Sequence, residues 1–128
     1  MDKFYVQCGP VEVVLLAEDA GSAAVAGIQR KLDAHLWIYD EPTLSDNDRR
    51  DHLMVEALLH LSPSIRVSQR GFDSDQFERF GTPETVLSYH RLMTGMRELF
   101  AAAGVPAATM QDVAGVKPVG GSTRRRAK

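Results

Sequence analysis

The chain has 128 residues, of which 44% are hydrophobic and 25% are charged, and its formal net charge is -2. This composition is that of an ordinary globular protein and excludes a disordered or membrane chain. Even the longest apolar runs, such as Val13–Ala17, are far shorter than the roughly 20 residues that a membrane-spanning helix requires, so we expect a cytoplasmic protein with no membrane partner.

The first predicted element is a tight β-hairpin. Its strands, Lys3–Cys8 and Val11–Ala17, are separated only by Gly9 and Pro10. Gly followed by Pro suits a type II′ turn, because Gly supplies a positive φ and Pro then fixes a negative φ. Cys8 then pairs with Val11, and one face of the hairpin is wholly apolar. That face consists of Phe4, Val6, Cys8, Val11, Val13 and Leu15. The second face is mixed and carries Lys3, Tyr5, Gln7, Glu12, Val14 and Leu16.

A helix is predicted over residues 20–34, with Asp19 as its N-terminal cap. Apolar residues recur in it at the spacing of a single stripe, which should cover the apolar face of the hairpin. The stripe consists of Ala24, Val25, Ile28 and Leu32. Leu36–Tyr39 then reads as a short strand or an extended link, which ends at the charged corner Asp40–Pro42.

A second helix is predicted from Ser45 or Asp46 to about Leu61. Its main apolar face consists of Leu53, Met54, Ala57, Leu58 and Leu61. Val55 and Leu59 lie nearly opposite that face. A helix with apolar residues on two sides should be buried on most sides, either within the fold or by a partner.

The remaining elements are a strand, a loop and a long helix. In Ile65–Arg70 one set of alternate residues is mainly apolar and the other is polar. This pattern predicts a strand at a sheet edge, with one face exposed to solvent. Gly71–Phe80 is predicted to be a loop rich in phenylalanine. Thr82 begins a helix with Pro at its first position, and this helix continues to about Ala102. Its broad apolar face comprises Val86, Tyr89, Leu92, Met93, Met96, Leu99 and Phe100.

These segments predict one α+β domain over residues 1–103. A small, mainly antiparallel sheet, formed by the N-terminal β-hairpin and one or two further strands, is packed by three helices in the order β-β-α-(β)-α-β-α. Residues 104–128 are rich in Gly, Pro, Ala and Ser without periodicity, which predicts a flexible, disordered basic tail.

The charge is distributed unevenly between these two parts. Residues 1–103 contain ten basic and sixteen acidic residues, a net charge of -6, whereas residues 104–128 carry a net charge of +4. An acidic body repels phosphate, so nucleic acid could be bound through the tail only. The residues for such contact are Arg124, Arg125, Arg126 and Lys128. A solubilising chain end is the alternative interpretation, because the cluster is short and has no aromatic residue to stack on a base.

A second candidate site is a series of potential metal ligands on the helix that ends near Leu61. Asp48, His52, Glu56 and His60 recur at every fourth residue. Each such step turns the side chain by about 40° around the helix, so no more than two or three of them can converge. A metal site centred on His52, Glu56 and His60 would therefore need ligands from elsewhere in the chain, and the sequence indicates none. The alternative is a solvated strip with favourable pairing between turns.

The sequence contains no pattern typical of a catalytic nucleophile, and we expect no cofactor. Cys8 lies on the apolar face of the predicted hairpin, where cysteine acts as a small hydrophobic residue. His35 and His90 have no partner at helical spacing. The protein is therefore expected not to be an enzyme, and the metal site is the only feature that would make it one.

The leading functional prediction rests on an excess of apolar surface. Either the last helix covers the second hairpin face, giving three layers, or part of this surface is an interface with a protein partner or a second copy of the chain. The predicted partner-binding residues are Tyr5, Val14, Leu16, Val55, Leu59, Phe72 and Phe77. We therefore expect a non-enzymatic interaction or regulatory module, with nucleic-acid binding and metal binding as alternatives.

Overall fold

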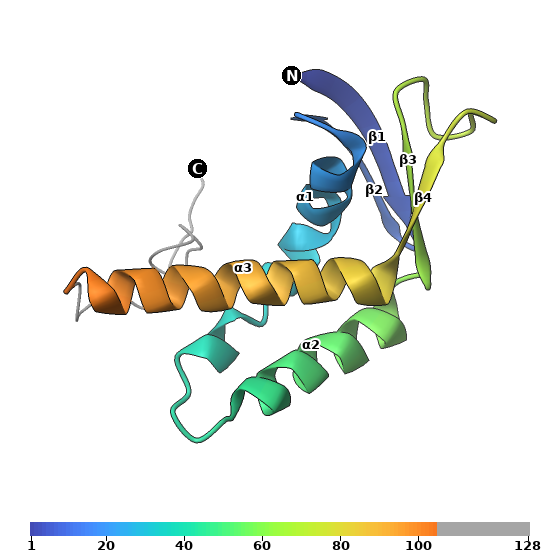
Figure 1. Cartoon of the computed structure of the whole chain (residues 1–128). Coiled ribbons are helices and arrows are strands. Elements are labelled where there is room, and N and C mark those ends of the chain that lie inside the picture. Colours follow the sequence, from blue (N-terminus) through green and yellow to red (C-terminus); the bar gives the residue numbers. More distant parts are fainter. Residues whose placement is uncertain (105–128) are drawn as a thin grey trace, which may run out of the picture.

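The computed structural model of the protein describes residues 1–104 (Figure 1). It has a four-stranded antiparallel sheet with the strand order β2-β1-β3-β4, together with three α-helices. The predicted α+β fold is thus confirmed. The elements are β1 (Asp2–Cys8), β2 (Val11–Ala17), α1 (Ala20–Asp33), the 3-10 helix η1 (Leu36–Tyr39), α2 (Asp46–His60), β3 (Ser64–Ser68), β4 (Glu78–Gly81) and α3 (Thr82–Ala102). The predicted tail lies outside the described residues from position 105 onward.

The N-terminal hairpin has the predicted register. Cys8 pairs with Val11, and the pairing continues without interruption to Asp2 and Ala17. Gly9 has a φ of 61°, and a Cβ atom there would lie 3.0 Å from the backbone nitrogen of Ser62. Glycine is therefore required both by the positive φ of the turn and by the close approach of the backbone at Ser62. The Cys8 side chain is buried, as predicted.

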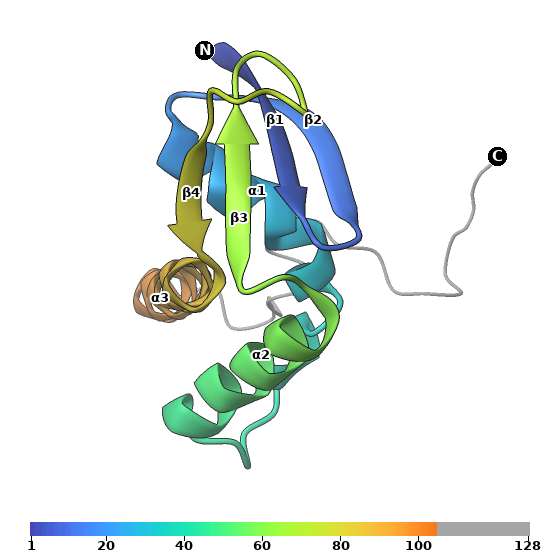
Figure 2. The same cartoon turned by 90° about the vertical axis from the view of Figure 1, so that its right-hand side faces the viewer.

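Helix α1 covers the apolar face of the hairpin, and Figure 2 shows it behind the sheet. The Asp19 carboxylate accepts a hydrogen bond from the backbone N–H of Ser22 at 2.8 Å, which caps the helix as predicted. The buried residues of α1 are Ala20, Ala23, Ala24, Gly27, Ile28 and Leu32. They complete the core with the inner side chains of β1 and β3.

Leu36–Tyr39 forms a 3-10 helix, so the prediction of a strand or extended link is wrong. Three of its four side chains are buried, whereas a strand would have pointed them alternately to opposite faces. Arg49 holds this segment: its Nε donates to the carbonyl oxygen of Ile38 at 2.8 Å, and its Nη2 donates to that of Glu41 at 2.9 Å. The helical conformation of this segment therefore follows from the burial of its side chains in more than one direction.

Strand β3 lies inside the sheet, between β1 and β4, so the prediction of an edge strand is wrong. The sheet edge on this side is formed by β4, most of which belongs to the segment predicted as a loop. The chain between β3 and β4 also covers the polar side of β3. There, Ser68 donates its hydroxyl hydrogen to the carbonyl oxygen of Gln76 at 2.8 Å, and Arg66 donates to that of Ser74 at 3.1 Å.

Helix α2 begins with a capping box formed by Ser45 and Asp48, in agreement with its predicted start. Its buried residues are Arg49, Leu53 and Ala57, so within the described chain it is not buried on most sides. Val55 and Leu59 are 56% and 70% exposed. The apolar residues on the far side of α2 are thus uncovered in residues 1–104.

Helix α3 begins at Thr82, as predicted, and buries Val86, Tyr89 and Met93. Figure 1 shows that the C-terminal half of α3 extends beyond the other helices. On the predicted apolar face, Leu92 and Leu99 are exposed. In Figure 2 no helix of residues 1–104 lies over the outer face of the sheet, so the three-layer arrangement is wrong. None of the helices in residues 1–104 combines the length and apolar character needed to span a bilayer.

Candidate functional site

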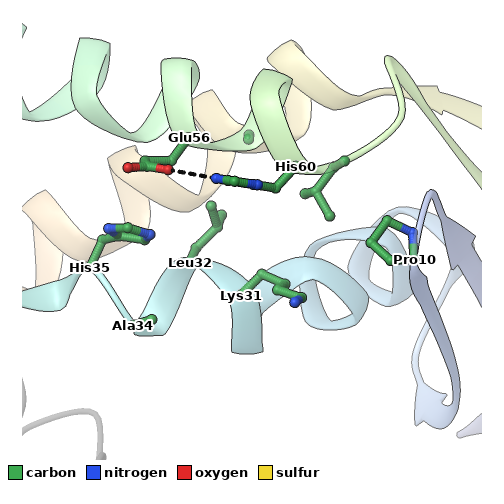
Figure 3. A pocket seen from close by; sticks show the side chains of 9 residues that line it. Pro10, Lys31, Leu32, Ala34, His35, Glu56 and His60 are labelled. Atoms are coloured by element: carbon green, nitrogen blue, oxygen red, sulfur yellow. Dashed lines mark ion pairs between the residues drawn. The ribbon is translucent and has the colours of Figure 1, made fainter.

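A cleft with several ionisable side chains lies between the C-terminal end of α1 and helix α2. It holds a cavity of about 410 Å³. The lining residues are Pro10, Lys31, Leu32, Ala34, His35, Glu56, Ala57, His60 and Leu61. Figure 3 shows His35 on the α1 side of this cleft and Glu56 and His60 on the opposite side. The cleft therefore combines an apolar floor with three side chains that can bind a metal ion or a proton.

Two histidines from different elements meet beside this cavity. Nε2 of His52, on α2, lies 3.1 Å from Nδ1 of His35, and the two ring centroids are 5.0 Å apart. The indole ring of Trp37 packs edge-to-face against the His52 ring at 5.4 Å. One ligand atom each from His35, His52 and Glu56 lies within 4.8 Å of the other two. These three residues, which we call the His-His-Glu cluster, are all partly buried.

His60 extends the cluster along α2. Its Nε2 lies 3.3 Å from Oε2 of Glu56, and its side chain is largely exposed (Figure 3). Burial lowers the pKa of His35 below its ordinary value, and the positive charges that His52 and His60 can carry act in the same direction. Glu56 opposes this shift. The lowered pKa favours the neutral form of His35, in which one ring nitrogen keeps a free lone pair.

The predicted metal ligands only partly converge. The structure brings His52 and Glu56 together and places His60 next to Glu56, whereas Asp48 is turned away because it caps α2. His35, which had no partner at helical spacing, is an additional potential ligand that the sequence did not indicate. It lies 17 residues before His52 and on another element, so only the reversal of the chain after α1 brings the two rings together.

His90 also has partners, although the sequence indicated none. The Tyr39 hydroxyl lies 2.9 Å from His90 Nδ1, and His90 Nε2 lies 2.9 Å from Oδ1 of Asp46. Tyr39 and His90 are both buried, and burial raises the pKa of the Tyr39 hydroxyl. A buried tyrosine of raised pKa is a poor nucleophile, and the pair is almost closed to solvent, with Tyr39 1% and His90 5% exposed. The network therefore joins η1, α3 and the start of α2 and is structural.

The predicted partner-binding residues divide into two groups. Tyr5 contacts Phe72 in an edge-to-face arrangement with centroids 5.2 Å apart, and the Arg66 guanidinium lies 4.0 Å from the centroid of the Phe77 ring. These aromatic side chains therefore pack within the chain. By contrast, Val14 and Leu16 on β2 are 50% and 64% exposed.

The predicted nucleic-acid residues Arg124, Arg125, Arg126 and Lys128 lie outside the described residues. Comparison of the chain with protein families, with curated proteins and with solved structures found no match. Any functional conclusion therefore rests on the chemistry of the surfaces and side chains described above.

Proposed function

We propose that the protein is a non-enzymatic interaction module that forms a homodimer through the free edge of strand β2. The observation that carries this proposal is the contrast between the two edges of the sheet. The β4 edge has only four residues and includes Glu78 and Arg79, whereas the β2 edge has seven residues with Glu12 as the only charge. Edge strands of monomeric proteins are usually protected by short length, charges, Pro or a bulge. The β2 edge is longer, has a single charge and contains no Pro or bulge, which favours pairing with another strand.

The register of the hairpin supports such pairing. In a two-residue hairpin the residues that flank the turn form a hydrogen-bonded pair, and bonded and non-bonded pairs then alternate along the strands. Cys8 and Val11 flank the turn, so the backbone N–H and C=O groups of Glu12, Val14 and Leu16 point away from β1. These groups are the ones that a further antiparallel strand would bind.

A second copy of the chain is the partner that fits this edge best. With a two-fold axis at Val14, all seven residues of β2 pair with the same strand of the other copy. Val14 then lies opposite Val14 of the second copy, and Leu16 lies opposite Glu12, so no two like charges face each other. The exposed side chains of Val14 and Leu16 would lose water on pairing, which contributes to dimer stability.

Sedimentation equilibrium of the full-length chain over a range of concentrations tests this proposal. We expect a monomer–dimer equilibrium that Val14→Pro shifts at least tenfold towards monomer, about 1.4 kcal/mol. Proline removes the backbone N–H group that points towards the second copy. Because the dimer is symmetric, one intermolecular hydrogen bond is lost from each of the two chains. The β1–β2 pairing should persist, because that N–H does not point towards β1.

Two variants serve as controls. Val14→Thr keeps the N–H group and the branched shape, and Leu59→Lys places a charge on the exposed side of α2 instead. Both should leave the dissociation constant within about threefold of the wild-type value. A strictly monomeric wild-type protein, or a Val14→Pro variant that dimerises as tightly as wild type, would refute the proposal.

A further inference from the structure

We propose that His35, His52 and Glu56 form a binding site for a divalent transition-metal ion of the Zn²⁺ type. This site is separate from the β2 edge, and the inference does not depend on dimer formation. Two imidazoles and one carboxylate suit zinc, nickel or cobalt, whereas Mg²⁺ and Ca²⁺ prefer oxygen ligands alone. The ligand set His₂Glu also leaves a fourth tetrahedral position for water or another small ligand.

The distance between the two histidine nitrogens agrees with tetrahedral coordination. An ion with metal–nitrogen bonds of about 2.0–2.1 Å holds two nitrogen ligands roughly 3.3 Å apart. The ring nitrogens of His35 and His52 are 3.1 Å apart, and the Glu56 oxygen lies within 4.8 Å of both. Small rotations of the side chains would bring all three ligand atoms into bonding distance of one ion.

The backbone at each ligand has a defined conformation. His52 and Glu56 are one helical turn apart on α2 and project to the same side. His35 comes directly before η1, whose side chains Leu36, Ile38 and Tyr39 are buried and fix the backbone there. Because the site is largely formed in advance, little conformational entropy is lost when an ion binds.

Two residues beside the cluster, His60 and Lys31, have different expected roles. His60 contacts the Glu56 carboxylate at 3.3 Å, so it is a positioning residue that orients this ligand. The cavity of about 410 Å³ adjoins His35 and Glu56, which leaves space for a ligand at the fourth position. Lys31 also lines this cavity, and its positive charge would favour an anionic ligand.

Isothermal titration calorimetry with Zn²⁺ tests the site on full-length protein that is purified without a metal-affinity tag and stripped by a chelator. We expect one ion per chain. His35→Gln, His52→Gln and Glu56→Gln should each weaken the affinity by at least tenfold, whereas His60→Gln should weaken it less than any of them. Asp51→Asn removes an exposed carboxylate from the same helix and should leave the affinity unchanged.

Nuclear magnetic resonance of the histidine ring nitrogens provides a readout that needs no variant. Zn²⁺ should shift the resonances of His35 and His52 together, and those of the buried His90 should not change. The proposal is overturned if Zn²⁺ gives no saturable binding, if His35→Gln and His52→Gln bind as tightly as wild type, or if only His60 responds. The last result would indicate adventitious binding at the surface. Circular dichroism of each metal-free variant separates loss of the site from loss of the fold.

Discussion

At the residue scale, two helical glycines have opposite surroundings. A Cβ atom on Gly27 of α1 would lie 2.9 Å from Cβ of Val6, which is fully buried in β1 and cannot move aside easily. A Cβ atom on Gly95 of α3 would meet nothing within 4 Å. Gly27 therefore allows the close approach of α1 to the sheet, whereas Gly95 only lowers the stability of its helix.

We predict that Gly27→Ala lowers the free energy of unfolding by about 1–3 kcal/mol, because the added methyl group overpacks the core. Gly95→Ala, the matched control, should raise it by about 0.5–1 kcal/mol through the higher helix propensity of alanine. Urea denaturation of both variants measures these changes. An equal gain in stability for the two substitutions would show that α1 does not approach β1 closely.

His35 predicts how stability depends on pH. Its pKa is lowered in the folded protein by burial first and then by His52 and His60, against the opposing effect of Glu56. As the pH falls through the ordinary histidine pKa of about 6.5, the unfolded chain therefore takes up this proton before the folded chain does. The contribution of His35 to stability is present above that pKa and is lost as the pH falls towards the folded value.

The measurement is the free energy of unfolding between about pH 8 and pH 5 in metal-free buffer. His35→Gln should reduce the loss of stability on acidification, because glutamine does not titrate. His60→Gln should change the acid dependence less than His35→Gln does, because the His60 side chain is 67% exposed and its effect on the pKa of His35 is the smallest of the causes. An unchanged pH dependence in His35→Gln would contradict the assignment of a neutral His35.

At the element scale, the start of α2 depends on its capping box. The Ser45 hydroxyl oxygen accepts from the Asp48 backbone N–H at 3.1 Å, and the Asp48 carboxylate accepts from the Ser45 N–H at 3.0 Å. The hydrogen bonds with Ser45 lower the pKa of Asp48. These bonds satisfy two N–H groups that have no partner within the helix.

Ser45→Ala should lower the free energy of unfolding by about 1 kcal/mol. Ser88→Ala, an exposed serine within α3, should change it by less than about 0.5 kcal/mol. Thermal unfolding followed by circular dichroism compares the two. If both substitutions had the same small effect, the capping box would not stabilise α2.

At the scale of the whole molecule, one hydrogen-bond network with a buried tyrosine and a buried histidine joins three elements. Tyr39 belongs to η1, His90 to α3 and Asp46 to the first turn of α2. When the Tyr39 hydroxyl donates to His90 Nδ1, the Nε2–H of the neutral imidazole donates to Asp46, so a single tautomer satisfies both contacts. The network thus holds the helices together at the end distant from the sheet.

Tyr39→Phe should lower the free energy of unfolding by about 1–3 kcal/mol, because His90 Nδ1 would stay buried without a partner. Tyr5→Phe removes a hydroxyl group from a half-buried tyrosine while keeping its ring contact with Phe72, and should have little effect. Equilibrium unfolding in urea measures both variants. Equal stabilities for the two would show that the network contributes nothing measurable.

The sequence alone was sufficient wherever structure depends on near neighbours along the chain. The Gly9-Pro10 turn determines the hairpin register, Asp19 and Ser45 determine where α1 and α2 begin, and Thr82 begins α3. Helical spacing also limited the metal ligands to two or three of the four candidates on α2. Turns, helix caps and the spacing of residues along one helix involve residues only a few positions apart, so they can be predicted from the local sequence.

Only the tertiary structure decided the features that depend on distant contacts. The conformation of Leu36–Tyr39 follows from burial on several sides, and the central place of β3 follows from its pairing with β1 and β4. His35 meets His52, and His90 meets Tyr39, because the chain reverses between these residues. The sequence around a short apolar segment or a single histidine does not indicate which residues it will contact. Those contacts are determined by the packing of the whole fold.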